Sequence, residues 1–162
     1  MSVDSSIAGE VVVEVLVDAS PETIFPFFTD PEKMTRWKGT RAELDPRPGG
    51  VYSVDVTHQA LARGRYLEVE PSKRVVFTWG WEGDDSVPPG SSTVEVTLEP
   101  QGSSTLVRLV HSGLPEDKRE LHREGWEHFG ARLRVAAPGG DPGPDPLLAQ
   151  DNQARWEGAG DG

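Results

Sequence analysis

The chain has 162 residues, a length that fits one domain, and 35% of them are hydrophobic and 27% charged. It contains no cysteine, which excludes disulfides, thiolate metal sites and cysteine nucleophiles. Its net charge of −11 disfavours nucleic acid and anionic membrane surfaces as partners, and no apolar run approaches the roughly 20 residues of a membrane helix. Because the start of the chain lacks the pattern of a secretory signal, we expect a cytoplasmic protein.

The first predicted element is a strand over residues 10–17, since EVVVEVLV is rich in β-branched residues and too short for a confident helix. The dipeptides Ser-Pro at 20–21 and Asp-Pro at 30–31 each place a capping residue before a proline at the first helical position. They predict two short helices. Pro26 is expected to kink or end the first helix, and the second is expected to continue through Trp37.

Residues 41–113 predict an antiparallel sheet, because apolar and polar residues alternate there in segments separated by turn residues. Six strands are expected to begin near residues 41, 51, 61, 74, 92 and 105. With the strand at 10–17 they make a sheet of about seven strands.

The last predicted element is a helix over residues 115–137, with acids in its first turns and arginines near its end, as the helix dipole favours. Its apolar stripe consists of Leu121, Gly125, Phe129 and Leu133, with His122 and Trp126 alongside. The inner face of the sheet is the only surface that can bury this stripe. The order of elements therefore predicts an α+β fold in which a curved antiparallel sheet grips one long helix.

The composition changes at Pro138, which sets the predicted domain at residues 1–137. Residues 138–162 contain 10 glycines or prolines among 25 residues and carry a net charge of −4, so we expect a flexible acidic tail. The alternative is that Leu147, Leu148 and Trp156 dock onto the domain or onto a partner.

Five segments follow one another in an order that is more specific than any one of them. They are ASPETIF at 19–25, TDPEK at 29–33, DPRPGGVY at 45–52, RVVFTW at 74–79 and HSGL at 111–114. With this order the chain resembles the START-like, or SRPBCC, superfamily, which has the helix-grip fold of the birch pollen allergen. Within that superfamily it is similar to the branch named for the activator of the Hsp90 ATPase, over residues 10–135.

The resemblance implies a cavity between the long helix and the concave face of the sheet, which many relatives use to hold a small apolar molecule. Mixed aromatic walls with few polar groups suit an apolar or aromatic ligand. A core filled by these side chains is the alternative, because any core uses such residues. The residues expected to line the cavity are Trp37, Tyr52, Val54, Phe77, Trp79, Val96, Leu109, His111, Trp126 and Phe129.

No catalytic or metal-binding pattern stands out, and we expect neither a metal nor a cofactor. His111 is a weak catalytic candidate that would need Tyr52 or Tyr66 as its hydroxyl partner, and a structural role is favoured for it. We expect His58 and His122 to lie in solvent.

These observations favour a small domain that binds an apolar or aromatic molecule. One alternative is a co-chaperone that activates the Hsp90 ATPase, with a place in the stress response. The other is a cyclase-like or hydrolase-like enzyme that uses the same cavity, although the sequence contains no catalytic pattern and therefore disfavours catalysis. An exposed sheet edge would allow a homodimer, and a monomer is equally compatible with the sequence.

Overall fold

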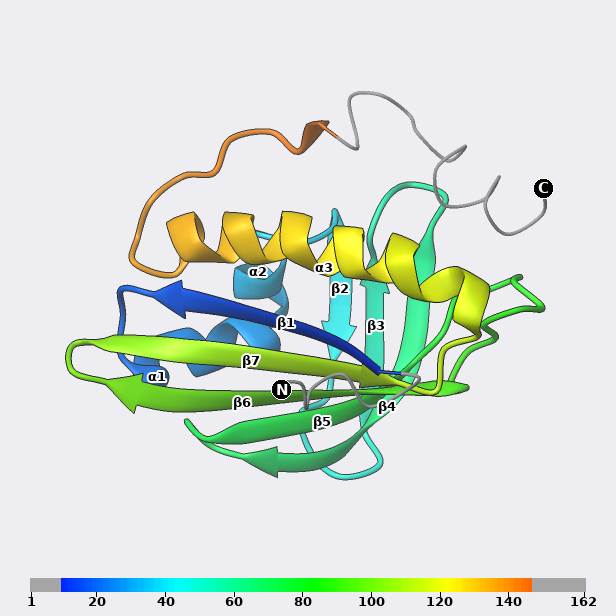
Figure 1. The fold of residues 1–162 in the computed structure, drawn as a ribbon, viewed down its shortest axis with the longest axis horizontal. Helices are drawn as coiled ribbons and strands as arrows, with labels where there is room; N and C mark the ends of the chain where they lie inside the picture. The colour runs from blue at the N-terminus through cyan, green and yellow to red at the C-terminus, as the bar shows by residue number, and fades with distance from the viewer. Residues whose placement is uncertain (1–9, 147–162) are drawn as a thin grey trace.

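The computed structural model describes residues 10–146 and has a seven-stranded antiparallel sheet crossed on one face by a long helix (Figure 1). In space the strands follow the order β1-β7-β6-β5-β4-β3-β2, so β1 pairs with the last strand of the chain. The strands are β1 (Glu10–Val17), β2 (Arg41–Leu44), β3 (Val51–Asp55), β4 (Leu61–Glu70), β5 (Arg74–Trp79), β6 (Ser92–Gln101) and β7 (Ser104–Ser112). The helix-grip architecture predicted from the sequence is confirmed.

Three short helical segments connect β1 to β2, namely α1 (Pro21–Ile24), the 3-10 helix η2 (Phe25–Phe28) and α2 (Pro31–Met34). The two predicted caps are present, because the Ser20 hydroxyl accepts the Thr23 amide hydrogen and the Asp30 carboxylate accepts that of Glu32. The prediction that the second helix continues through Trp37 is wrong. After Met34 the chain continues in turns, in which the Trp37 amide bonds only three residues back.

The alternation predicted for the sheet is also confirmed, and it gives the sheet one buried face. Tyr52 and Val54 are buried on β3, and Val94 and Val96 on β6, while their neighbours are more exposed. Gly64 marks a close approach of β4 to β5, since a Cβ there would come within 1.9 Å of the Thr78 carbonyl oxygen.

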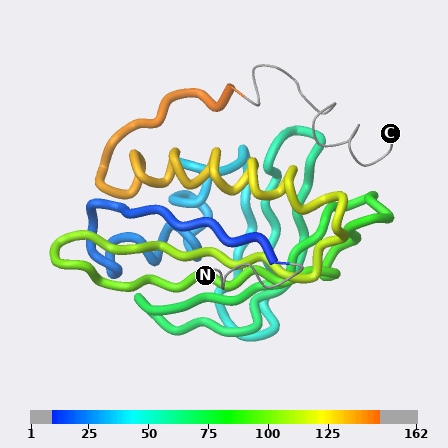
Figure 2. The backbone as a smooth tube through the Cα atoms, in the orientation of Figure 1, coloured from blue at the N-terminus to red at the C-terminus, as the bar shows by residue number. Residues whose placement is uncertain are grey.

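The long helix, α3 (Glu116–Ala136), lies over the buried face of the sheet and runs beside β1 (Figure 2). Its buried stripe is centred slightly differently from the predicted one, because His122 is buried while Leu121 is only half-buried. His58 is exposed as predicted, but the expectation that His122 lies in solvent is wrong. The buried residues of α3 are Lys118, His122, Gly125, Trp126, Phe129, Gly130, Leu133 and Ala136.

Replacing Gly130 by alanine is expected to raise the free energy of unfolding by about 0.5–1 kcal/mol. The residue lies in the interior of α3, and a Cβ there would meet Val15 at 3.9 Å, which is an ordinary contact. Urea unfolding measures the change. Gly139→Ala is the matched control and should lose stability, because Gly139 has a φ of +109°. A destabilised Gly130→Ala protein would contradict the packing of α3 on β1.

Residues 138–146 follow α3 and turn back along it (Figure 1). Asp145 is buried and bonds to His128 Nε2 at 2.9 Å, and Arg132 donates a 3.0 Å hydrogen bond to the Gly143 carbonyl. Leu147, Leu148 and Trp156, for which docking was considered, lie outside the described residues. No helix among residues 10–146 has the length and apolarity required to cross a membrane.

Candidate functional site

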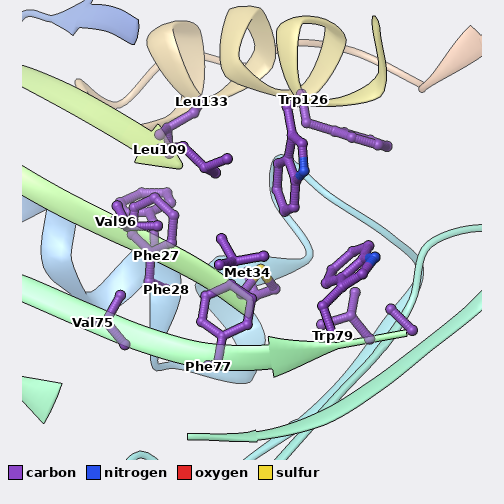
Figure 3. Packing of buried hydrophobic residues seen from close by; sticks show 14 of the residues in the cluster. Phe27, Phe28, Met34, Val75, Phe77, Trp79, Val96, Leu109, Trp126 and Leu133 are labelled. Atoms are coloured by element: carbon purple, nitrogen blue, oxygen red, sulfur yellow. The ribbon is translucent and has the colours of Figure 1, made fainter. Parts of the chain in front are cut away.

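The structure brings all ten residues predicted to line the cavity into the layer between the sheet and α3. None of them is more than 6% exposed. Figure 3 shows Phe77 and Trp79 rising from β5 toward Trp126 and Leu133 of α3, with Phe27, Phe28 and Met34 entering from the short helices.

Aromatic rings dominate one half of this layer, around Trp79. The indole of Trp79 lies 5.1 Å from the rings of both Trp81 and Trp126, measured between ring centroids. The ring of Tyr52 stacks on that of Phe77 with 4.0 Å between the centroids, and its centroid lies 6.1 Å from that of Trp79. These contacts make a rigid wall with large apolar faces.

His111 is held within this wall by hydrogen bonds on both ring nitrogens. Trp126 Nε1 donates to His111 Nδ1 at 2.9 Å, so His111 Nε2 carries the proton and donates to the Ser92 hydroxyl at 2.8 Å. The Ser92 hydroxyl in turn donates to the Trp79 carbonyl at 2.8 Å. Burial lowers the pKa of His111 well below its usual value, and the nearby His122 and Lys38 lower it further.

The hydroxyl next to His111 is therefore that of Ser92, and the predicted tyrosine partners are wrong. Tyr66 donates to the Phe28 carbonyl at 2.8 Å instead, and the ring of Tyr52 packs on Phe77. An acid–base role for His111 would break one of its two hydrogen bonds, so the geometry favours the structural role.

His122 of α3 is held in a similar way, with both ring nitrogens in hydrogen bonds. Trp81 Nε1 donates to His122 Nε2 at 2.9 Å, and His122 Nδ1 donates to the Lys118 carbonyl at 2.8 Å. Burial is the main cause that lowers the pKa of His122 to about 4, so the imidazole is neutral at pH 7.

Acidification should destabilise the fold through His122. Between pH 6.5 and pH 4 the unfolded chain binds a proton at His122 and the folded chain does not, so stability is lost as the pH falls. Going from pH 7 to pH 5 is expected to remove about 2 kcal/mol of stability through this side chain. Urea unfolding of the wild type and of His122→Gln at both pH values measures this contribution. Equal losses in the two proteins would contradict it.

Lys38, which no sequence pattern pointed to, is the most unusual residue of the site. The side chain is only 2% exposed, and Nζ lies 3.7 Å from the ring centroid of Trp126, 4.0 Å from that of Trp79 and 5.6 Å from that of Phe129. Burial lowers the pKa of Lys38 well below its usual value. A lysine just after a short helix is typical of solvated surface, and no sequence pattern distinguishes this one.

The interior around Lys38 is nearly filled. Within residues 10–146, cavities of about 10 Å³ and about 20 Å³ lie beneath α3, and each has room for about one water molecule. Trp126 lines both, so its indole separates them. The smaller cavity is lined by Lys38, Val56, Trp79, Trp81, His122, Gly125, Trp126 and Phe129.

A wider groove of about 500 Å³ lies on the surface, beside the segment that contains Lys38. Arg36 and Gly39 line this groove, whereas Lys38 between them lines the smaller interior cavity. The other side of the groove is formed by residues 140–145, with Arg132 of α3.

Three relatives among those found by comparison with known proteins show the range of similarity. A solved AHSA1-like protein from Rhizobium etli, RHE_CH02687, is 48% identical, with 86% of this chain and 89% of that chain covered and a TM-score of 0.66. DynU16, a protein in the dynemicin biosynthetic locus, is 25% identical, with coverage of 84% and 49% and a TM-score of 0.73. The uncharacterized protein C1711.08 of Schizosaccharomyces pombe is 28% identical over 105 residues, which are 64% of this chain and 30% of that protein. The chain thus spans about a third of the yeast relative and about half of DynU16.

The family model described as "Activator of Hsp90 ATPase homolog 1-like protein" matches residues 18–137. This range runs from the end of β1 to the end of α3 and contains Lys38, His111, His122 and the surrounding tryptophans. The chain therefore belongs to the family of activator of Hsp90 ATPase homolog 1-like proteins.

Proposed function

We propose that the protein binds a small apolar or aromatic molecule in the layer between α3 and the sheet. The observation that carries this proposal is the buried Lys38 amine. Among residues 10–146 no carboxylate pairs with it, and aromatic rings surround it. An unpaired amine in an apolar interior lowers stability, and interiors keep such groups where a ligand uses them.

Binding requires a movement, because neither interior cavity holds more than about one water molecule. Trp126 is the side chain whose displacement would join the two cavities. Gly125 lines the smaller cavity and Gly130 lines the larger one, so each cavity borders a position of α3 that has no side chain. The ligand would therefore take the place of the Trp126 indole or shift α3 away from the sheet.

The occurrence of DynU16 in a biosynthetic locus supports a role in small-molecule metabolism for this fold. For the present chain we favour binding over catalysis, since both nitrogens of His111 and both nitrogens of His122 are engaged in hydrogen bonds.

The test is native mass spectrometry of the protein purified gently from its own host, compared with the same sample after denaturation. We expect a released small molecule in near-stoichiometric amount, and a rise in melting temperature when that molecule is added back to the stripped protein. A ligand-free mass, together with no thermal shift across a panel of apolar metabolites, would refute the proposal.

The family match supports a second candidate, a partner of an Hsp90-type chaperone. In that case the exposed surface rather than the interior would carry the function. Stimulation of the ATPase of the host chaperone by the purified protein would support this candidate, and an unchanged ATPase rate with no capture of the chaperone would exclude it.

A further inference from the structure

We infer that the ligand carries an acidic oxygen, a carboxylate or a phenolate, which binds Nζ of Lys38. This inference rests on the proposed function, since it specifies the chemical class of the molecule bound between α3 and the sheet.

The smaller cavity offers two hydrogen-bond donors that lack an acceptor. Lys38 Nζ has no hydrogen-bond acceptor within the described part of the chain, and it faces ring planes instead. Trp79 Nε1 is buried and, within residues 10–146, has no partner either. Both side chains line the same cavity. An ammonium that contacts only ring faces and a buried indole N–H without a partner lie beside one cavity, and an acceptor there would satisfy both.

The two imidazoles beside Lys38 cannot supply that acceptor. His111 of β7 and His122 of α3 lie near enough to Lys38 for its charge to lower the pKa of each. Each of them accepts an indole N–H, from Trp126 and Trp81 respectively, so neither has a free lone pair. An acceptor for Nζ therefore has to come from a ligand or from water.

An anionic oxygen satisfies this site better than a neutral one. The walls are aromatic and exclude water, so an ion pair with the ammonium forms in a medium of low dielectric constant. If the ligand enters as a neutral acid and meets the neutral amine, its O–H bond breaks, an N–H bond forms at Nζ, and the same ion pair results. The faces of Trp79 and Phe129 then hold the apolar body of the ligand.

Lys38 also lies in a segment that borders both the outer groove and the inner cavity. Its chain neighbours Arg36 and Gly39 line the outer groove, while Lys38 itself lines the inner cavity.

A matched pair of probes tests the inference, namely 2-naphthoate and its neutral isostere 2-naphthamide, titrated calorimetrically at pH 7. We expect the wild type to bind 2-naphthoate about tenfold more tightly than the amide. Lys38→Met should lose this preference and still bind the amide. Lys73→Met, which removes an exposed lysine, should retain it.

Equal affinity of the wild type for the two probes would overturn the inference that the ligand carries an acidic oxygen, and it would leave the proposed function standing. So would a molecule released from the native protein that has no acidic group. Failure of both probes to bind, combined with a ligand-free native mass, would overturn the proposed function and this inference together.

A second measurement decides the matter if Lys38→Met does not fold. The ¹³Cε resonance of Lys38 in the wild type reports the ionisation of its amine. Saturating 2-naphthoate should raise the pKa of Lys38, because the anion stabilises the ammonium, and 2-naphthamide should not. An unchanged titration in the presence of bound 2-naphthoate would contradict the inference.

Discussion

Trp126→Ala is expected to lower the free energy of unfolding by about 4 kcal/mol. The indole fills the space between the two interior cavities, lies 5.1 Å from the ring of Trp79 and donates a hydrogen bond to His111 Nδ1. Its removal leaves a void beneath α3 and an unsatisfied buried nitrogen, and both effects destabilise the folded chain.

Urea unfolding measures this loss, and Trp126→Phe separates its two causes. The phenylalanine variant keeps most of the packing and loses the hydrogen bond to His111, so its loss should be about 1–2 kcal/mol. Free indole should restore part of the stability of Trp126→Ala by occupying the void, as apolar molecules do in engineered cavities. A loss below about 1 kcal/mol for Trp126→Ala would show that the indole is not a core element.

Lys38→Met is expected to raise the free energy of unfolding by about 2 kcal/mol. Methionine matches the length of the lysine stem and fills the same space without an ionisable group. The wild type has to desolvate an amine that no carboxylate within residues 10–146 pairs with, and its contacts with Trp79 and Trp126 offset this only in part. If the fold becomes more stable when Lys38 is replaced, the lysine is retained for a function and not for stability.

The pH dependence identifies desolvation as the cause. Because the pKa of Lys38 is lowered on folding, the unfolded chain holds more protons than the folded chain between that lowered pKa and pH 10.5. Wild-type stability therefore rises with pH across this window, and the advantage of Lys38→Met should shrink from pH 7 to pH 10. Lys73→Met should change stability by less than about 0.5 kcal/mol at either pH. A Lys38→Met protein less stable than the wild type would mean that the cation–π contacts outweigh the burial.

Much of the fold can be predicted from the sequence, because strands and the long helix follow from local periodicity. β1 spans residues 10–17 as predicted, and β3, β4, β5 and β6 begin at the expected residues. α2 ends earlier than predicted because hydrogen bonding after Met34 changes to the tighter pattern of turns, which no composition signal marks.

The interior of the site was only partly predictable. Strand phase placed Tyr52, Phe77 and His111 on the buried face, since alternation fixes which way a strand residue points. The same argument fails for Lys38, which lies in a turn, where neighbouring residues have no fixed alternation. His122 was missed because a polar residue beside an apolar stripe is usually solvated, and only the tertiary contact with Trp81 shows why it is buried.

The family resemblance implied a cavity that holds a ligand, whereas the cavities beneath α3 are each the size of about one water molecule. This difference depends on how the side chains pack and not on the hydrophobic pattern of the sequence. The strand phases and the helix stripe place Trp79 and Trp126 on facing surfaces, but their rotamers decide whether a gap remains between them. Residue spacing contains no information on that choice.

The indole N–H resonances of Trp37, Trp79, Trp81 and Trp126, followed by NMR as 2-naphthoate is added, test most directly whether the interior binds small molecules. The account predicts that the Trp79 resonance moves most, since its N–H has no partner within residues 10–146 until the acceptor arrives. The Trp37 resonance should stay in place, because that N–H already donates to the Phe27 carbonyl at 3.0 Å. Saturation with no change at Trp79 and Trp126 would contradict a ligand site beneath α3.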